Sequence, residues 1–174
     1  QKRSFKREVF SWIACIVVTI LLTEFILNFV IINANIPSGS MENTIMTNDK
    51  LIALRTSYWF NDPKRGDIII FKYPDDETEW FIKRVIALPG ETVLVKDGKV
   101  YINGSKKALS EPYIKEEPVE DFGPYKVPKN GYFVMGDNRN NSNDAREWET
   151  HYVSRDEVLG KAWFRYYPSI KVIK

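Results

Sequence analysis

The stretch VFSWIACIVVTILLTEFILNFVII, which runs from Val9 to Ile32, decides how the chain is organised. It contains 24 residues, and 16 of them are Val, Ile, Leu or Phe. As a helix it is roughly 36 Å long, which exceeds a bilayer core of about 30 Å. Glu24 and Asn28 oppose insertion, but the apolar residues contribute roughly 5 to 10 kcal/mol against about 3 kcal/mol for a central acid. The stretch therefore predicts one transmembrane helix.

Charged residues next to this span set its expected orientation. Four basic residues precede the span: Lys2, Arg3, Lys6 and Arg7. No comparable cluster of basic residues follows it. Because Lys and Arg stay on the cytoplasmic side, we expect residues 1–8 in the cytoplasm, 9–32 in the membrane and 33–174 outside. A cleaved signal peptide is the alternative, since it also joins a basic stub to an apolar core. Such cores run about 7 to 15 residues and end at small residues, so the span favours an uncleaved anchor.

The composition of the outer domain excludes several classes of function. Residues 33–174 hold 21 basic and 21 acidic residues, so the domain has no electrostatic footprint for nucleic acid. The only cysteine, Cys15, lies in the span, which leaves the outer domain without a disulfide. A single histidine and no cysteine cluster argue against a zinc site. We therefore expect no metal and no cofactor.

Short runs rich in Val, Ile, Phe, Tyr and Trp follow the span, separated by Gly, Pro, Asn or Asp, as is typical of β-strands. The expected strands are Asp49–Arg55, Asp67–Tyr73, Trp80–Leu88, Glu91–Lys96, Val100–Asn103, Tyr132–Met135 and Lys161–Tyr167. Asp97-Gly98 predicts a tight hairpin, because such turns need φ > 0. Residues 104–130 contain four prolines and predict an irregular surface segment, and Arg155–Leu159 predicts a short helix. The outer domain is therefore predicted to be mainly β.

The first candidate for chemistry is Ser40, in the sequence Ile36-Pro37-Ser38-Gly39-Ser40-Met41 shortly after the span. A serine hydroxyl needs a base to act as a nucleophile at neutral pH. The only histidine, His151, lies in a polar stretch and is interpreted as an ordinary surface or half-buried residue. Lys83 can serve instead if burial lowers its pKa from about 10.4 toward about 8, which requires about 3 kcal/mol. Its neighbours are apolar, although Lys83 taken alone would be interpreted as an outward-facing strand lysine.

Four segments, in order along the chain, resemble the sequence boxes of bacterial type I signal peptidases: Ile36–Met41, Gly66–Phe71, Lys83–Glu91 and Gly136–Arg146. The resemblance covers the apolar anchor and nearly all of the outer domain. It implies a signal-peptidase/LexA-like β domain on a single N-terminal transmembrane helix, with the activity of a serine endopeptidase. Three residues depart from the family pattern: Asn43 stands where proline is frequent, Ala145 stands where serine is common, and Glu42 adds an acid beside the site.

Carried over position by position, the resemblance implies a role for each matching residue. Ser40 would be the nucleophile, and Lys83 the general base that takes its proton. The backbone N–H of Ser40 and the hydroxyl of Ser38 would form the oxyanion hole, where one donor contributes about 2.7 to 4 kcal/mol in other enzymes. The hydroxyl of Ser142 would orient Lys83. Four charged residues are expected to support the surrounding loop: Asp137, Arg139, Asp144 and Arg146.

The resemblance also implies the substrates, which are preproteins delivered by the secretion translocon and cut after small residues in the pattern Ala-X-Ala. The residues expected to line shallow apolar pockets are Ile36, Pro37, Met41 and Ile82. An extended substrate would add a strand beside Trp80–Arg84 or Asn35–Ser38. The expected location is the plasma membrane of a bacterium. Tyr58-Trp59-Phe60 is expected either to enter the bilayer interface or to pack in the core.

Three alternatives share part of this pattern. LexA-type self-cleaving repressors use a similar serine and lysine, but they need a DNA-binding domain where this chain has an anchor. The archaeal and endoplasmic-reticulum type of signal peptidase has histidine at the position of Lys83. Signal-peptidase-like proteins that act as non-catalytic chaperones of pilus or surface-protein assembly should lack the serine–lysine pair, which is present here. Loss of preprotein processing in Ser40→Ala at normal expression would separate the enzyme from the chaperone.

Overall fold

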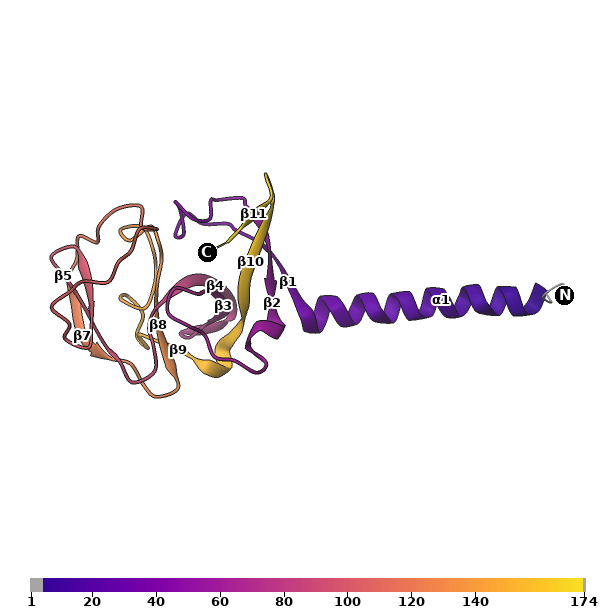
Figure 1. Ribbon diagram of the computed structural model, residues 1–174, viewed down its shortest axis with the longest axis horizontal. Coiled ribbons are helices and arrows are strands. Elements are labelled where there is room, and N and C mark those ends of the chain that lie inside the picture. Colours follow the sequence, from indigo (N-terminus) through magenta and orange to yellow (C-terminus); the bar gives the residue numbers. More distant parts are fainter. Residues whose placement is uncertain (1–4, 174) are drawn as a thin grey trace.

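The structure is a computed structural model that describes residues 5–173, so Lys2 and Arg3 of the predicted basic stub lie outside the described residues. The chain begins with the helix α1 (Phe5–Phe25), which continues as a π-helical turn over Ile26–Val30. Within the described residues, Arg7–Val30 is the one helix long and apolar enough to cross a membrane. Figure 1 shows it as a rod that projects away from the rest of the molecule.

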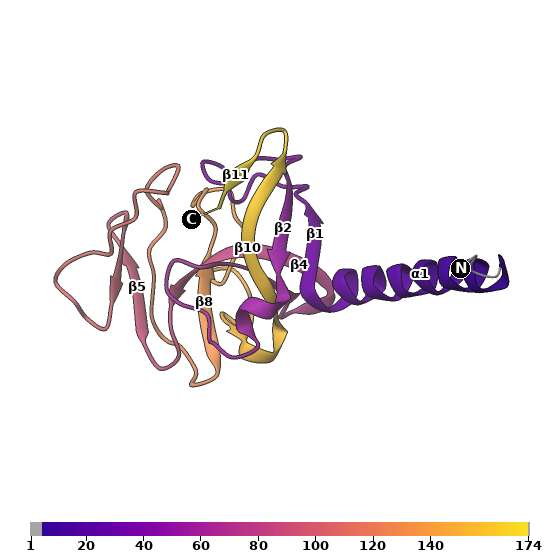
Figure 2. The same ribbon diagram turned by 45° about the vertical axis from the view of Figure 1, so that its right-hand side comes forward.

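The rest of the described chain is mainly β, which confirms the predicted fold class. A larger sheet of eight antiparallel strands has the order β1-β2-β10-β3-β4-β8-β9, and β11 pairs with β10. Figures 1 and 2 show β1 and β2 on the side nearest the helix. The strands of this sheet are β1 (Ile31–Asn35), β2 (Lys50–Leu54), β3 (Ile68–Tyr73), β4 (Asp76–Ala87), β8 (Gly131–Met135), β9 (Val153–Ser154), β10 (Val158–Tyr167) and β11 (Lys171–Val172).

A smaller sheet lies at the end of the domain farthest from the helix (Figures 1 and 2). Its strands have the order β6-β5-β7 and comprise β5 (Thr92–Lys96), β6 (Lys99–Ile102) and β7 (Phe122–Lys126). The turn between β5 and β6 has φ values of 49° at Asp97 and 74° at Gly98. Both residues therefore adopt the left-handed conformation that a two-residue hairpin turn requires, as their sequence predicts.

Alternating residues of β3 face two apolar clusters, which explains the uninterrupted run of large side chains in this strand. Ile69 and Phe71 belong to a cluster that includes residues of the smaller sheet, while Ile68 and Ile70 belong to a cluster beneath β1 and β2. Successive side chains of a strand point to opposite faces, so β3 is buried on both sides. Because β4 pairs with β3 on one edge and with β8 on the other, polar residues in its second half are also buried.

Two boundaries differ from the sequence-based expectation at the junctions of the domain. The apolar run extends to Ile32, but the helix ends at Val30, because Ile31 and Ile32 are extended in β1 and pair with β2. The segment Arg155–Leu159 forms only a 3₁₀ turn at Arg155–Glu157, because the following residues are drawn into β10. Strand pairing therefore takes precedence over local pattern at both places.

The proline-containing segment 104–130 is irregular except for β7, which the sequence analysis did not predict. Residues of β7 pair with Thr92, Val93 and Val95 of β5, with an irregularity in the register. Prolines disfavour a central strand, but β7 is at the edge of the three-stranded sheet, where a missing N–H donor is tolerated.

Candidate active site

Ser40 lies in a tight turn shortly after β1. Backbone N–H groups of Thr44 and Ile45 donate to the carbonyl of Met41 at 3.1 and 2.8 Å and close the turn. Met41 and Ile45 are buried in the core, so apolar packing anchors the turn from below. The carbonyl of Ser40 accepts a hydrogen bond of 3.1 Å from the backbone of Asn138. The serine itself is only 7% exposed.

Lys83 comes from the buried half of β4 and points toward this turn. Its side chain is buried, and its Nζ lies within hydrogen-bond distance, 2.7 Å, of Ser40 Oγ. Burial lowers the pKa of Lys83 to about 8, although the carboxylates of Asp144, Asp137 and Glu147 act in the opposite direction. The desolvation that the apolar neighbours of Lys83 predict is therefore present, and it brings the amine into the range where it can be neutral.

Two further serines lie beside this pair. Ser38 Oγ is 3.4 Å from Ser40 Oγ. Ser142 Oγ is buried and has no hydrogen-bond partner among the described residues. Gly136 packs so closely here that a Cβ on it would collide with Ser142 Oγ and with the carbonyl of Ser40. Glycine at position 136 therefore allows the loop that carries Ser142 to approach the serine turn.

The charged residues of this loop, residues 136–146, are held by buried polar contacts. Asp144 accepts a hydrogen bond of 2.9 Å from the backbone of Gly136 and pairs with Arg146 at 2.9 Å. Arg146 also donates to the carbonyl of Arg139 at 2.6 Å. These contacts close the loop on itself, so it can hold Ser142 and Asn138 in fixed places.

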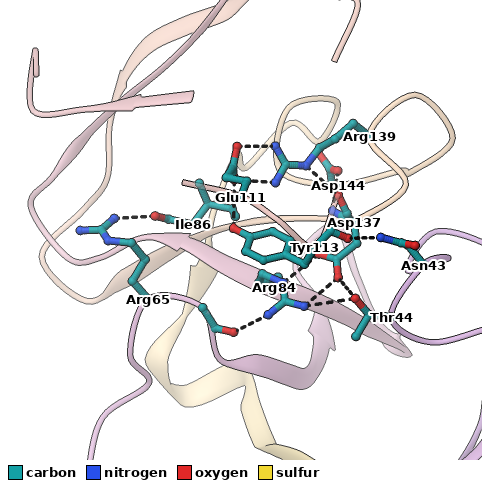
Figure 3. A network of polar contacts seen from close by, with 12 residues as sticks. Asn43, Thr44, Arg65, Arg84, Ile86, Glu111, Tyr113, Asp137, Arg139 and Asp144 are labelled. Atoms are coloured by element: carbon teal, nitrogen blue, oxygen red, sulfur yellow. Dashed lines mark hydrogen bonds and ion pairs between the residues drawn. The ribbon is translucent and has the colours of Figure 1, made fainter. Parts of the chain in front are cut away.

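A second set of contacts connects the loop to β4 and to the serine turn (Figure 3). Arg84, next to Lys83, donates two hydrogen bonds to Asp137 at 2.8 and 2.7 Å, and both side chains are almost fully buried. Thr44 of the serine turn donates to the same carboxylate at 2.5 Å. Asp137 therefore connects the strand of Lys83 to the turn of Ser40.

A cavity of about 520 Å³ opens in front of Ser40 and Lys83. Three of the four residues predicted for apolar pockets, Ile36, Pro37 and Ile82, line it, and the same three line an adjoining cavity of about 250 Å³. Met41 does not, because it is fully buried in the core beneath the turn. The remaining lining residues of the larger cavity are Ser38, Gly39, Glu79, Trp80, Phe81, Asn141 and Asn143.

The other sequence candidates take up different positions. His151 is half-buried beside the smaller sheet, where its Nδ1 lies 2.8 Å from the carbonyl of Ala145 and its ring contacts Phe122 and Tyr125. It does not line the cavity. The sequence pattern did not assign a role to Arg84. An arginine inside an apolar strand does indicate a buried ion pair, because charged residues are rarely buried without a partner.

Comparison with known families places this chain among the peptidases. A family model described as "Signal peptidase, peptidase S26" matches residues 9–167, and the chain belongs to this family. Probable signal peptidase I-2 of Synechocystis sp. is 44% identical over 90% of this chain and 72% of its own length. Signal peptidase I of Bacillus amyloliquefaciens is 34% identical over 100% of this chain and 96% of its own length. A crystal structure of a signal peptidase I from Enterococcus faecalis V583 covers 58% of this chain and 97% of its own, with 36% identity and a TM-score of 0.50.

Proposed function

We propose that this protein is a membrane-bound serine endopeptidase that removes signal peptides from exported preproteins. Membership of the signal peptidase family supports this type of reaction. The observation that carries the proposal is the 2.7 Å contact between Ser40 Oγ and Lys83 Nζ, at the base of an open cavity. A buried amine with a pKa of about 8 is suited to receive a proton from a hydroxyl.

In the proposed reaction the neutral amine of Lys83 accepts the proton of Ser40 Oγ as the oxygen attacks the scissile carbonyl. Lys83 then returns the proton to the leaving amine, and a water molecule hydrolyses the acyl-enzyme with the same lysine as base. The backbone N–H of Ser40 and the hydroxyl of Ser38, 3.4 Å from the nucleophile, would stabilise the oxyanion. The unpaired hydroxyl of Ser142 is available to orient the amine.

The cavity supports cleavage after small residues. Its apolar lining of Ile36, Pro37 and Ile82 offers shallow space for the side chains of an Ala-X-Ala substrate. β8 pairs with β4 only from Arg84 onward. On the edge of β4 that faces β8, the residues before Arg84 therefore have no partner from β8. An extended peptide laid between this edge and the segment after β1 would form main-chain hydrogen bonds that do not depend on sequence.

The proposed membrane attachment uses the helix Arg7–Val30, with its basic end in the cytoplasm and the β domain outside. The 3₁₀ turn Arg55–Tyr58 lies against the end of this helix. Tyr58 is buried in the core cluster that includes Ile69 and Phe71, whereas Trp59 and Phe60 are exposed. Exposed aromatic side chains next to the end of a membrane helix suit the bilayer interface, so the proposal places these two residues there.

The competing function is a non-catalytic chaperone of pilus or surface-protein assembly. The two are separated by incubating an Ala-X-Ala preprotein with detergent-solubilised wild type, Ser40→Ala and the matched control Ser57→Ala. We expect cleavage by the wild type and by Ser57→Ala, and none by Ser40→Ala. Folded wild-type protein that leaves the preprotein intact would refute the peptidase and favour the chaperone.

A further inference from the structure

A short piece of the segment between β6 and β7 contacts residues close in sequence to both members of the proposed catalytic pair: Asn43 on the serine turn and Arg84 next to Lys83. We call residues Glu111–Lys115 the strap. Figure 3 shows Glu111 beside Arg139 of the loop 136–146, and Tyr113 beside Arg84 of β4 and Asn43 of the serine turn. None of its residues lines the cavity in front of Ser40. The strap therefore lies outside the lining of this cavity.

On the serine side, the strap is bound by the two residues that follow Met41. Asn43 Nδ2 donates to the backbone carbonyls of Tyr113 and Ile114 at 2.9 and 3.3 Å. Lys115 Nζ pairs with Glu42 at 2.7 Å. Asn43 has a φ of 91°, a conformation uncommon for residues other than glycine. The side-chain hydrogen bonds help to hold the turn in this conformation.

On the lysine side, the aromatic ring of Tyr113 covers the guanidinium of Arg84, with 3.9 Å between the guanidinium carbon and the ring centroid. Arg84 is adjacent to Lys83 and binds Asp137. The backbone N–H of Lys115 donates to the carbonyl of Asp137 at 3.0 Å. A cation over an aromatic face in a desolvated site is an attractive contact, so the ring holds Arg84 in its ion pair.

The strap is itself fixed at its first residue. Tyr113 Oη donates to Glu111 at 3.0 Å, and Glu111 accepts two hydrogen bonds from Arg139 at 2.7 and 3.1 Å. Arg139 in turn donates to the carbonyl of Gly136 at 3.0 Å. Burial and the adjacent Glu111 raise the pKa of Tyr113, so its hydroxyl remains a donor at alkaline pH.

We propose that Tyr113 is a positioning residue for the serine–lysine pair: its ring holds the strand of Lys83 and its backbone carbonyl holds the turn of Ser40. This inference rests on the proposed peptidase function. Asn43 is three residues from Ser40, and Arg84 is adjacent to Lys83, so a displaced strap shifts both groups. A displacement of about 1 Å between reacting groups can cost about 100-fold in rate.

The experiment compares Tyr113→Leu, Tyr113→Phe and the matched control Tyr101→Leu, which makes the same change in β6 of the smaller sheet. Steady-state cleavage of an Ala-X-Ala peptide by the detergent-solubilised full chain gives kcat and KM, at a temperature where thermal unfolding shows every variant folded. We expect Tyr113→Leu to lower kcat by roughly 10- to 100-fold with KM within about twofold of wild type. Tyr113→Phe keeps the ring over Arg84 and should remain within about threefold of wild type, and Tyr101→Leu should match wild type.

A second pair of variants tests the backbone contact without altering the ring. Asn43→Gly allows the same φ but removes both hydrogen bonds to the strap, and Asn48→Gly is its control, at a φ of 68°. We expect Asn43→Gly to lower kcat with KM unchanged, and Asn48→Gly to have no such effect. Wild-type kcat in Tyr113→Leu and Asn43→Gly, with only a lower Tm, would overturn the positioning role. Absence of cleavage by folded wild type would instead overturn the proposed function.

Discussion

The pH dependence of cleavage follows from the burial of Lys83. The group's ordinary pKa of 10.5 is lowered to about 8, a shift that corresponds to about 3 kcal/mol in favour of the neutral amine. At pH 7 the neutral fraction is then about 10%, compared with about 0.03% for an exposed lysine, a gain of about 300-fold in competent base. Because the neutral amine is the proposed active form, we expect the rate to rise with pH.

The assay is kcat/KM for an Ala-X-Ala peptide between pH 6 and pH 10, with circular dichroism at each pH to verify that the protein stays folded. We expect the logarithm of kcat/KM to rise by about one per pH unit below a midpoint of about 8 and to level off above it. Between pH 7 and pH 9 the rate should increase about tenfold. A rate that falls from pH 6 upward, or a midpoint near 10 in folded protein, would refute the role of Lys83 as a desolvated base.

Three substitutions test other parts of the site. Arg84→Met leaves Asp137 buried without its cationic partner and should destabilise the fold by about 3 to 5 kcal/mol in chemical denaturation, whereas Lys72→Met, which breaks an exposed pair with Glu77, should cost about 1 kcal/mol or less; equal losses would contradict this. Gly136→Ala places a methyl group against Ser142 Oγ and the carbonyl of Ser40, so we expect lower Tm and at least a tenfold loss of kcat; wild-type kcat would show that the loop can move away. Ser142→Ala removes a hydroxyl that has no hydrogen-bond partner within residues 5–173 and should reduce kcat strongly while leaving Tm unchanged or higher; a wild-type kcat would exclude a role for Ser142 in orienting Lys83.

Much of the fold could be predicted because its signals are local. The apolar run from Val9 predicts the helix, and runs such as Ile68-Ile69-Ile70-Phe71 predict strands without knowledge of their partners. Asp97-Gly98 specifies its own turn through backbone conformation. The strands β1, β7, β9 and β11 were missed because pairing with other strands, and not local composition, makes those residues extended.

Some residues of the site were predicted from the sequence and others were not, because some contacts form only through the folding of distant segments. The sequence boxes placed Ser40, Lys83 and Ser142 in one site, and the structure brings Ser40 and Lys83 to within 2.7 Å. Met41 was assigned to the pocket, but its side chain is buried in the core. The preceding residue, Ser40, lines the cavity instead. The strap was not predicted, because Tyr113 and Arg84 are far apart in sequence and meet only through the path of an irregular segment. Contacts of that kind leave no periodic signal in a sequence.

The variant Lys83→Met removes the amine that we propose as the base for Ser40. Methionine keeps the length and apolar stem of the lysine side chain but cannot accept a proton. The measurement is single-turnover cleavage of an Ala-X-Ala preprotein by the folded variant between pH 7 and pH 10, beside wild type. We expect cleavage by wild type and none by Lys83→Met at any pH. Turnover by Lys83→Met near the wild-type rate would contradict that proposal.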